Sequence, residues 1–244
     1  MPYNAQFTPI PTLLPPPKSA QWKDGFLDWN IARFEADSRG MPAGEHVCSQ
    51  TDNSIAHDQG YYLKISEDGI TIKSRTEPGA RLAFQTLRQI ALQSDERGMR
   101  MVEISDYPDL EVRGFMLDIS RCKVPTMDEL SRLLDKLALF KYNRLELYTE
   151  HTYAFSGHEI VWADASPMTK SKYARLQKLC DFAGIELVAN MNGLGHMERW
   201  LRYPQYAHLA ESKAPFIDPL GTVRKFPTTL YPDKSALDFM DGLY

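Results

Sequence analysis

Residues 112–119 read VRGFMLDI and form a nearly continuous apolar run. Such a run is typical of a strand that is buried on both faces of a parallel sheet. Two further apolar runs, at residues 144–149 and 185–191, are also predicted strands, and the segments between them carry apolar residues at helical spacing. Strands that alternate with helices indicate parallel pairing with right-handed crossovers.

Two helices are predicted between these strands. Thr126 and Glu129 have the spacing of a capping box, so we expect a helix to begin there. The second helix is predicted over residues 173–183, and Gly184 is a typical residue to end it. Strand, helix, strand, helix and strand therefore follow one another as repeated βα units.

The length of this repeating region indicates an incomplete barrel. A closed eight-unit barrel takes about 250 residues, and residues 111–244 supply about half of that. A doubly wound open sheet is the main competing fold, but no Gly-x-Gly-x-x-Gly motif follows the first strand. We therefore predict an α/β fold in which residues 106–244 form the first half of a (β/α)8 TIM barrel, with about four βα units or fewer.

Residues 1–105 are predicted to form a small α+β domain. Its proline-rich N-terminal segment, residues 1–20, favours an extended arm. The runs at residues 61–65 and 70–73 flank an Asp-Gly pair, which is a strong signal of a β-hairpin. A helix of about four turns is expected from Pro78 onward because apolar residues recur at helical spacing.

Composition excludes several classes of protein. Hydrophobic residues make up 43% of the chain and charged residues 25%, which is ordinary for a folded protein. The net charge of −4 has the wrong sign for attraction to nucleic acid or an anionic membrane, so an uncharged partner is favoured. The three cysteines are too widely spaced for a disulfide framework or a zinc ribbon, and buried free thiols are expected. With no basic segment followed by an apolar one at the N-terminus, a cytoplasmic location is expected.

Four segments of the chain resemble glycoside hydrolase family 20, the β-N-acetylhexosaminidases, and most closely its hexosaminidase D branch. They are ARLAFQTL at 80–87, RGFMLDISR at 113–121, LYTEHTYAF at 147–155 and NMNGLGHME at 190–198. The first resembles the small domain that precedes the barrel, and the others resemble its first three strands. The resemblance covers about residues 60–244. Many members of the family have aspartate at the position of Asn192.

The resemblance implies an activity. Family members remove a terminal N-acetylhexosamine (GlcNAc or GalNAc) from a glycan by a substrate-assisted retaining mechanism, in which the 2-acetamido oxygen replaces a protein nucleophile. It implies no metal and no cofactor. The family's catalytic Asp-Glu pair follows the fourth strand, so we expect it beyond Tyr244 and expect this chain to be an inactive fragment. An open barrel edge would then favour a homodimer.

The resemblance also implies four substrate-binding residues: Arg113, Glu150, His196 and Glu198. Arginine can bind sugar hydroxyls through its rigid fork of donors, and carboxylates are strong acceptors for the same groups. Glu150 ends the second strand, on the barrel face where active sites assemble. His196 is expected to act as a polar partner at the exit of the third strand. Arg113, Glu150 and His196 are expected to surround one shared hollow of the size of a sugar.

Two alternatives to a hexosaminidase portion stay open. The first is a non-catalytic half-barrel that binds a carbohydrate. A metal-dependent TIM-barrel hydrolase is a further alternative, because Glu150, His151, His158 and His196 are candidates to gather at one face. Their spacing defines no coordination geometry. Near the first strand, Asp118 and Arg121 are expected to form a salt bridge that holds the loop.

Overall fold

The computed structural model describes residues 10–30, 33–38 and 40–244. The chain forms two compact units, each assembled from separate segments. The first contains Met1–Gly114, Ser131–Arg144 and Leu179–Glu186, and the second contains Phe115–Leu130, Leu145–Lys178 and Leu187–Tyr244. These units interleave along the chain and differ from the predicted domains, 1–105 and 106–244. The division into those two domains stays a prediction.

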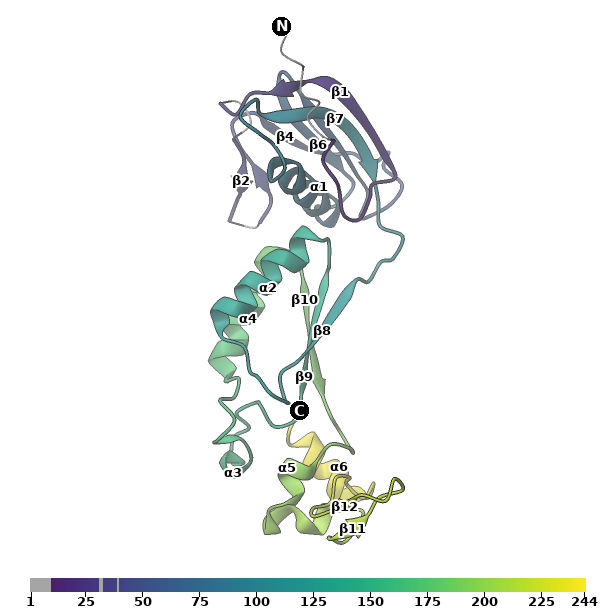
Figure 1. The fold of residues 1–244 in the computed structure, drawn as a ribbon, viewed down its shortest axis with the longest axis vertical. Helices are drawn as coiled ribbons and strands as arrows, with labels where there is room; N and C mark the ends of the chain where they lie inside the picture. Colours follow the sequence, from purple (N-terminus) through teal and green to yellow (C-terminus); the bar gives the residue numbers. More distant parts are fainter. Residues whose placement is uncertain (1–9, 31–32, 39) are drawn as a thin grey trace, which may run out of the picture. The chain divides into compact units, whose positions relative to one another are not determined.

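A five-stranded sheet with the order β1-β7-β5-β6-β4 forms the first unit (Figure 1). Its strands are β1 (Ser19–Leu27), β4 (Val47–Thr51), β5 (Tyr61–Ser66), β6 (Gly69–Ser74) and β7 (Met99–Asp106). The predicted hairpin is confirmed: β5 and β6 are antiparallel, and Ser66 pairs with Gly69. Two short strands, β2 (Glu35–Ala36) and β3 (Pro42–Ala43), form a separate ribbon.

Helix α1 (Glu77–Ala91) packs against this sheet, as the helical spacing predicted. Side chains from the helix and the strands form one apolar core, in which Leu63, Ile72 and Leu87 are 0% exposed. The described part of the predicted arm also contributes, because Leu13 is buried in this core. Residues 10–18 form no helix or strand, so the extended arm stays a prediction, and residues 1–9 lie outside the described residues.

A second sheet has the order β10-β9-β8. Its strands, β8 (Gly114–Asp118), β9 (Arg144–Thr149) and β10 (Glu186–Met191), match the predicted strands closely. Asn143 N–H donates to Arg113 O at 3.0 Å before β8 and β9, and Ile119 N–H donates to Tyr148 O at 3.1 Å at their far ends. Because the paired positions advance together along both strands, the pairing is parallel, as predicted.

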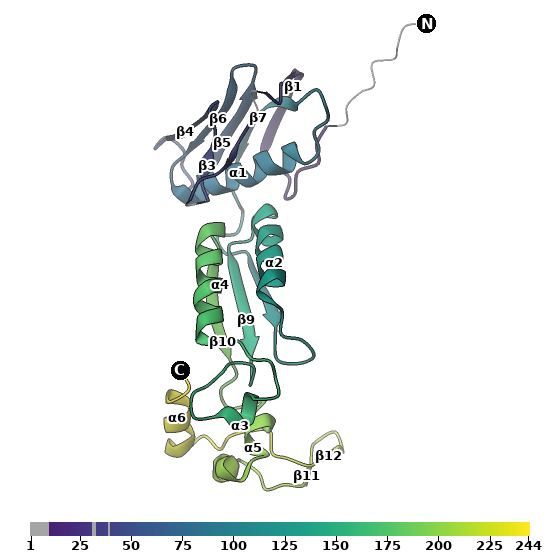
Figure 2. The ribbon, with the colours of Figure 1, turned by 90° about the vertical axis from the view of Figure 1, so that its left-hand side faces the viewer.

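Helices α2 (Met127–Leu139) and α4 (Lys170–Ala183) cover one face of this sheet (Figures 1 and 2). The capping box before α2 is confirmed: Thr126 N–H donates to Glu129 Oε2 at 2.9 Å, and Glu129 N–H donates to Thr126 Oγ1 at 3.2 Å. Gly184 follows α4 with φ of +69°, a backbone conformation typical of a helix C-terminus. Local sequence signals therefore predict where α2 begins and where α4 ends.

Strand β8 departs from its predicted burial on both faces. It is an edge strand of the sheet, and Met116 is 55% exposed. In β9 the even-numbered side chains are only partly buried, whereas the alternating Leu145 and Leu147 are buried. The reason is that α2 and α4 cover one face, so the other face carries polar residues.

The remaining elements lie beyond the carboxyl ends of the strands (Figure 2). They are α3 (Glu159–Trp162), α5 (Glu198–Leu201), a 3-10 helix η1 (Pro204–Leu209), β11 (Phe216–Ile217), β12 (Val223–Arg224) and α6 (Lys234–Asp241). An aromatic cluster around Trp200, which is 0% exposed, forms their core. Cys180 is buried as expected, but Cys48 and Cys122 are exposed. Within the described residues, every helix is too short or too polar to span a bilayer.

Candidate functional site

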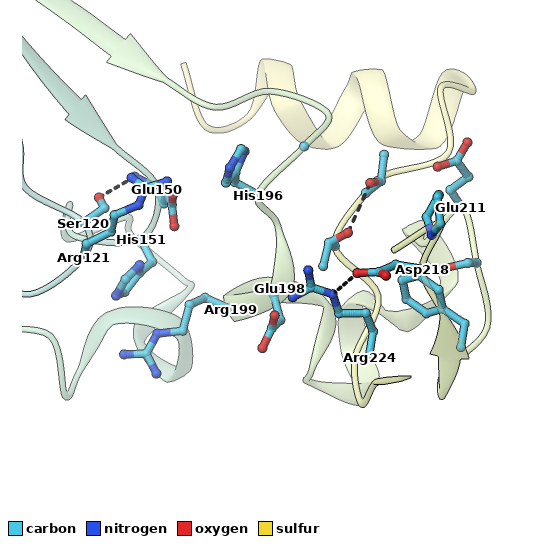
Figure 3. A pocket seen from close by; sticks show the side chains of 16 residues that line it. Ser120, Arg121, Glu150, His151, His196, Glu198, Arg199, Glu211, Asp218 and Arg224 are labelled. Carbon is cyan, nitrogen blue, oxygen red and sulfur yellow. Dashed lines mark hydrogen bonds and ion pairs between the residues drawn. The ribbon is translucent and has the colours of Figure 1, made fainter. Parts of the chain in front are cut away.

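A cavity of about 890 Å³ lies at the carboxyl ends of the parallel strands, entirely within the second unit. Ser120 and Arg121 follow β8, and Glu150 and His151 follow β9. The loop after β10 contributes further residues, among them His196 and Glu198. Figure 3 shows how they lie, with Asp218, Arg224 and Glu211 on the opposite wall. The structure therefore brings Glu150, His196 and Glu198 together, as predicted.

The Glu150 carboxylate is held from one side. Tyr148 Oη donates to Glu150 Oε1 at 2.9 Å, and Arg121 Nη2 lies 3.3 Å from the same oxygen. The Glu150 backbone N–H donates to Ser120 Oγ at 2.7 Å (Figure 3). Among the described residues, no group donates a hydrogen bond to Oε2. The side chain is only 13% exposed, so one acceptor oxygen of a largely buried carboxylate is left for a ligand.

Arg121 joins two carboxylates. It forms the predicted salt bridge with Asp118, which is confirmed, and it also contacts Glu150. Its guanidinium lies over the Tyr148 ring, 4.9 Å from the centroid. Three interactions therefore fix an arginine whose contact with Glu150 the sequence did not predict.

His196 follows β10 and adopts a left-handed backbone conformation, with φ of +59°. Positive φ is uncommon outside glycine and is found at functional sites, where surrounding contacts maintain it. Here Met197 N–H donates to Thr228 O at 2.9 Å and Leu230 N–H donates to Leu194 O at 2.8 Å, so the loop is held on both sides of His196.

Asp218 and Arg224, on the opposite wall of the cavity, were not predicted to belong to the site. Asp218 accepts hydrogen bonds from Thr222 N–H at 2.9 Å and from Arg224 Nε at 3.0 Å. These donors, the Thr222 N–H most strongly, lower the pKa of Asp218. The segment DPLG at 218–221 carries turn residues, and only this local signal was visible in the sequence.

The charges that line the cavity largely compensate one another. Arg121 pairs with Asp118 and Glu150, and Arg224 pairs with Asp218. Arg199, a further lining residue, lies 3.2 Å from Asp164. Paired charges present donors and acceptors without a strong net field, which suits an uncharged polar ligand.

His151 is a buried member of the cavity wall. Its side chain is 7% exposed, and Nδ1 has no hydrogen-bond partner among the described residues. Burial lowers the pKa of His151 to about 4, and the positive charges of Arg199 and Arg202 act in the same direction, whereas Asp164 opposes them. The imidazole is therefore neutral at pH 7.

This lowered pKa predicts acid lability. The ordinary histidine pKa is 6.5, so between pH 6.5 and 4 the unfolded chain takes up a proton that native His151 does not. The free energy of unfolding should therefore fall by about 2–3 kcal/mol over this range and level off below it. His151→Gln should be less sensitive to pH in guanidinium unfolding experiments. Equal slopes for the wild type and this variant would contradict the assignment.

Arg113 does not reach the cavity. Its guanidinium donates to Lys141 O at 2.6 Å, Leu110 O at 2.6 Å and Gln59 Oε1 at 2.8 Å. Burial lowers its pKa. Arg113 precedes the amino end of β8, whereas Glu150 follows the carboxyl end of β9. In parallel strands, these two positions lie at opposite ends of the strands. The prediction that Arg113 shares a hollow with Glu150 and His196 is therefore wrong. Backbone carbonyls and the Gln59 side chain accept the hydrogen bonds of its guanidinium.

Glu150, His151 and His196 line the cavity but His158 does not, so the proposed gathering of all four residues is wrong. His158 lies in the aromatic cluster, where Nδ1 is 2.7 Å from Tyr206 Oη. In the part of the chain that the structure describes, no group of three or more His, Cys, Asp or Glu side chains is arranged to hold a metal ion. The geometry does not support the metal-dependent alternative.

Comparisons with known proteins agree with the fold. A family model described as glycosyl hydrolase family 20, domain 2, matches residues 13–107. The chain is 28% identical to beta-hexosaminidase 1 of Coccidioides posadasii over 207 residues, covering 77% of this chain and 32% of that protein. It is 26% identical to the beta-hexosaminidase subunit alpha of Mus musculus, covering 73% and 38%. The chain thus spans about a third of the length of these relatives.

A solved structure has the same fold. The GH20 exo-beta-N-acetylglucosaminidase of Vibrio harveyi, in complex with N-acetylglucosamine, matches with a TM-score of 0.73 and 18% identity, covering 94% of this chain and 43% of that one. These names do not distinguish the hexosaminidase D branch, which stays a prediction. The domain match and the named relatives show that this chain is similar to the N-terminal portion of the β-N-acetylhexosaminidases of glycoside hydrolase family 20.

Proposed function

We propose that the protein removes terminal N-acetylhexosamine from glycans by substrate-assisted retaining catalysis, and that this chain holds the sugar. The observation that carries the proposal is the Glu150 carboxylate, which lines a cavity together with His196 and whose Oε2 accepts no hydrogen bond from the described residues. Its volume of about 890 Å³ lies within the range of small-molecule sites. The compensated charges of the wall favour a neutral sugar over a charged ligand.

In the proposed reaction, the acetamide oxygen of the substrate forms a bond to the anomeric carbon as the bond to the leaving oxygen breaks. Water then opens the cyclic intermediate, and the configuration is retained. This chemistry calls for a proton donor and a group that orients the acetamide. Among the described residues, no adjacent Asp-Glu pair lines the cavity, so the proposal gives these residues the task of binding and orienting the sugar.

The β8-α2-β9-α4-β10 layer is proposed to be the first part of a (β/α)8 barrel, preceded by the small α+β domain. Three parallel strands with crossover helices on one face, and a cavity at their carboxyl ends, support this interpretation. The cytoplasmic location and the homodimer stay predictions.

Calorimetry with N-acetylglucosamine thiazoline tests the proposal on the full chain. The wild type should bind, and Glu150→Gln should bind about 30- to 100-fold more weakly, because a charge-assisted acceptor is lost. Glu186→Gln removes a carboxylate that pairs with Arg144 in the first unit, and it should bind like the wild type.

Two results would contradict the proposal. One is wild-type protein that does not bind the thiazoline, and the other is Glu150→Gln with unchanged affinity. An aryl N-acetylglucosaminide assay adds a separate check. Binding without turnover agrees with the binding task given to the cavity, whereas rapid hydrolysis by this chain alone would show that it contains its own proton donor.

A further inference from the structure

Cross-strand polar pairs line the face of the second sheet that α2 and α4 leave uncovered. Along β9, Glu146, Tyr148 and Glu150 share this face because side chains alternate along a strand. Asn190 Nδ2 donates to Glu146, and two residues further Asn192 Nδ2 donates to the Tyr148 hydroxyl. Each pair joins β10 to β9, and the second pair leads directly to the cavity.

The direction of these hydrogen bonds is determined by the groups. A tyrosine hydroxyl has one proton, and the Asn192 amide N–H is a donor only. Because Tyr148 Oη accepts from Asn192, its own proton is available to Glu150 Oε1 at 2.9 Å. Arg121 Nη2 approaches the same oxygen at 3.3 Å. Both protein donors therefore engage Oε1 and leave Oε2 of this cavity-lining carboxylate available as an acceptor.

We propose that Tyr148 and Asn192 are positioning residues, which hold Glu150 through Oε1 so that Oε2 accepts a hydrogen bond from a hydroxyl of the bound sugar. This inference rests on the proposed function and assigns it two residues that bind no sugar themselves. A free glutamate side chain samples several rotamers, and ordering it on binding costs free energy. A carboxylate already held in one orientation avoids that cost.

Asn192 is the most informative position. An aspartate at this position would accept a hydrogen bond where asparagine donates one. In Asn192→Asp the new carboxylate would compete with Glu150 for the Tyr148 proton and add a negative charge beside it. The Asn192–Tyr148–Glu150 chain would then no longer hold Oε1.

Affinity for N-acetylglucosamine, measured by NMR titration of the full chain, tests the proposal. Tyr148→Phe removes only a hydroxyl and should weaken binding about 10-fold, and Asn192→Asp should weaken it at least as much. Tyr231→Phe and Asn53→Asp, which make the same changes outside the cavity, should stay within about 2-fold of the wild type.

Deoxy sugars separate positioning from a merely structural effect. Among the 3-, 4- and 6-deoxy analogues of N-acetylglucosamine, the one that lacks the hydroxyl bound by Glu150 should bind the wild type about 10-fold more weakly than the parent sugar. In Tyr148→Phe and Asn192→Asp this penalty should shrink to less than about 3-fold. The proposal would be overturned if the variants bound every sugar more weakly by the same factor, so that removing this hydroxyl still weakened binding about 10-fold.

A failure of the proposed function is distinguishable from a failure of this inference. If the wild type binds none of these sugars, the proposed function fails. Crystal structures without ligand then decide the positioning role. Glu150 Oε1 should stay within hydrogen-bond distance of Tyr148 Oη in the wild type and move away in Asn192→Asp. An unmoved carboxylate in that variant would overturn the inference.

Discussion

Replacing Trp200 with alanine is expected to lower the free energy of unfolding by about 3–5 kcal/mol. The indole is 0% exposed and makes edge-on contacts with Phe155, His158 and Phe239, whose ring centroids lie 5.3–5.4 Å away. Truncation leaves a cavity among these rings and removes their favourable edge-to-face geometry. Guanidinium unfolding followed by far-UV circular dichroism measures the loss.

Trp200→Phe is the matched control. Its ring still fills much of the cluster, and it removes an indole N–H that is buried without a partner among the described residues. Burying an unpaired donor is itself unfavourable. The phenylalanine variant should therefore lose much less stability than the alanine variant. Similar losses in both would show that the cluster does not depend on packing around this ring.

Replacing Asp106 with alanine is also expected to cost about 3–5 kcal/mol, because it would leave a buried cation without its partner. Lys141 Nζ lies 2.9 Å from Asp106 Oδ2, and the two side chains are 6% and 11% exposed. The Tyr61 hydroxyl donates to the same carboxylate oxygen at 3.0 Å. Burial lowers the pKa of Lys141, and the Asp106 charge opposes that shift.

The double variant Asp106→Leu with Lys141→Met gives the control for this pair. Removing both charges together avoids a stranded ion and should recover most of the stability lost by Asp106→Ala. Unfolding free energies of the wild type, Asp106→Leu, Lys141→Met and the double variant form a mutant cycle. Additive losses would contradict the interaction between the two side chains.

Patterns that are local in the sequence predicted the elements well. The bounds of β9 coincide with the predicted strand, and Thr126 with Glu129 forms the predicted capping box. Both depend on residues within one element. Glu150 and His196 each follow the carboxyl end of a parallel strand, so both lie at the same end of the sheet and line one cavity.

The errors arose where partners distant in sequence decide the outcome. Arg113 was expected at the sugar because of the family resemblance, but its guanidinium donates to Lys141 O and to Gln59 Oε1, both distant from it in sequence. The wall formed by Asp218 and Arg224 depends on how the segment after η1 folds back onto the cavity. No pattern of spacing carries that information.

A crystal structure of the full chain with N-acetylglucosamine thiazoline would show where the sugar binds. We expect the sugar ring in the cavity, with one hydroxyl within about 3.2 Å of Glu150 Oε2 and His196 at the same sugar. The same ligand bound beside Arg113, or anywhere else away from Glu150, would contradict this expectation.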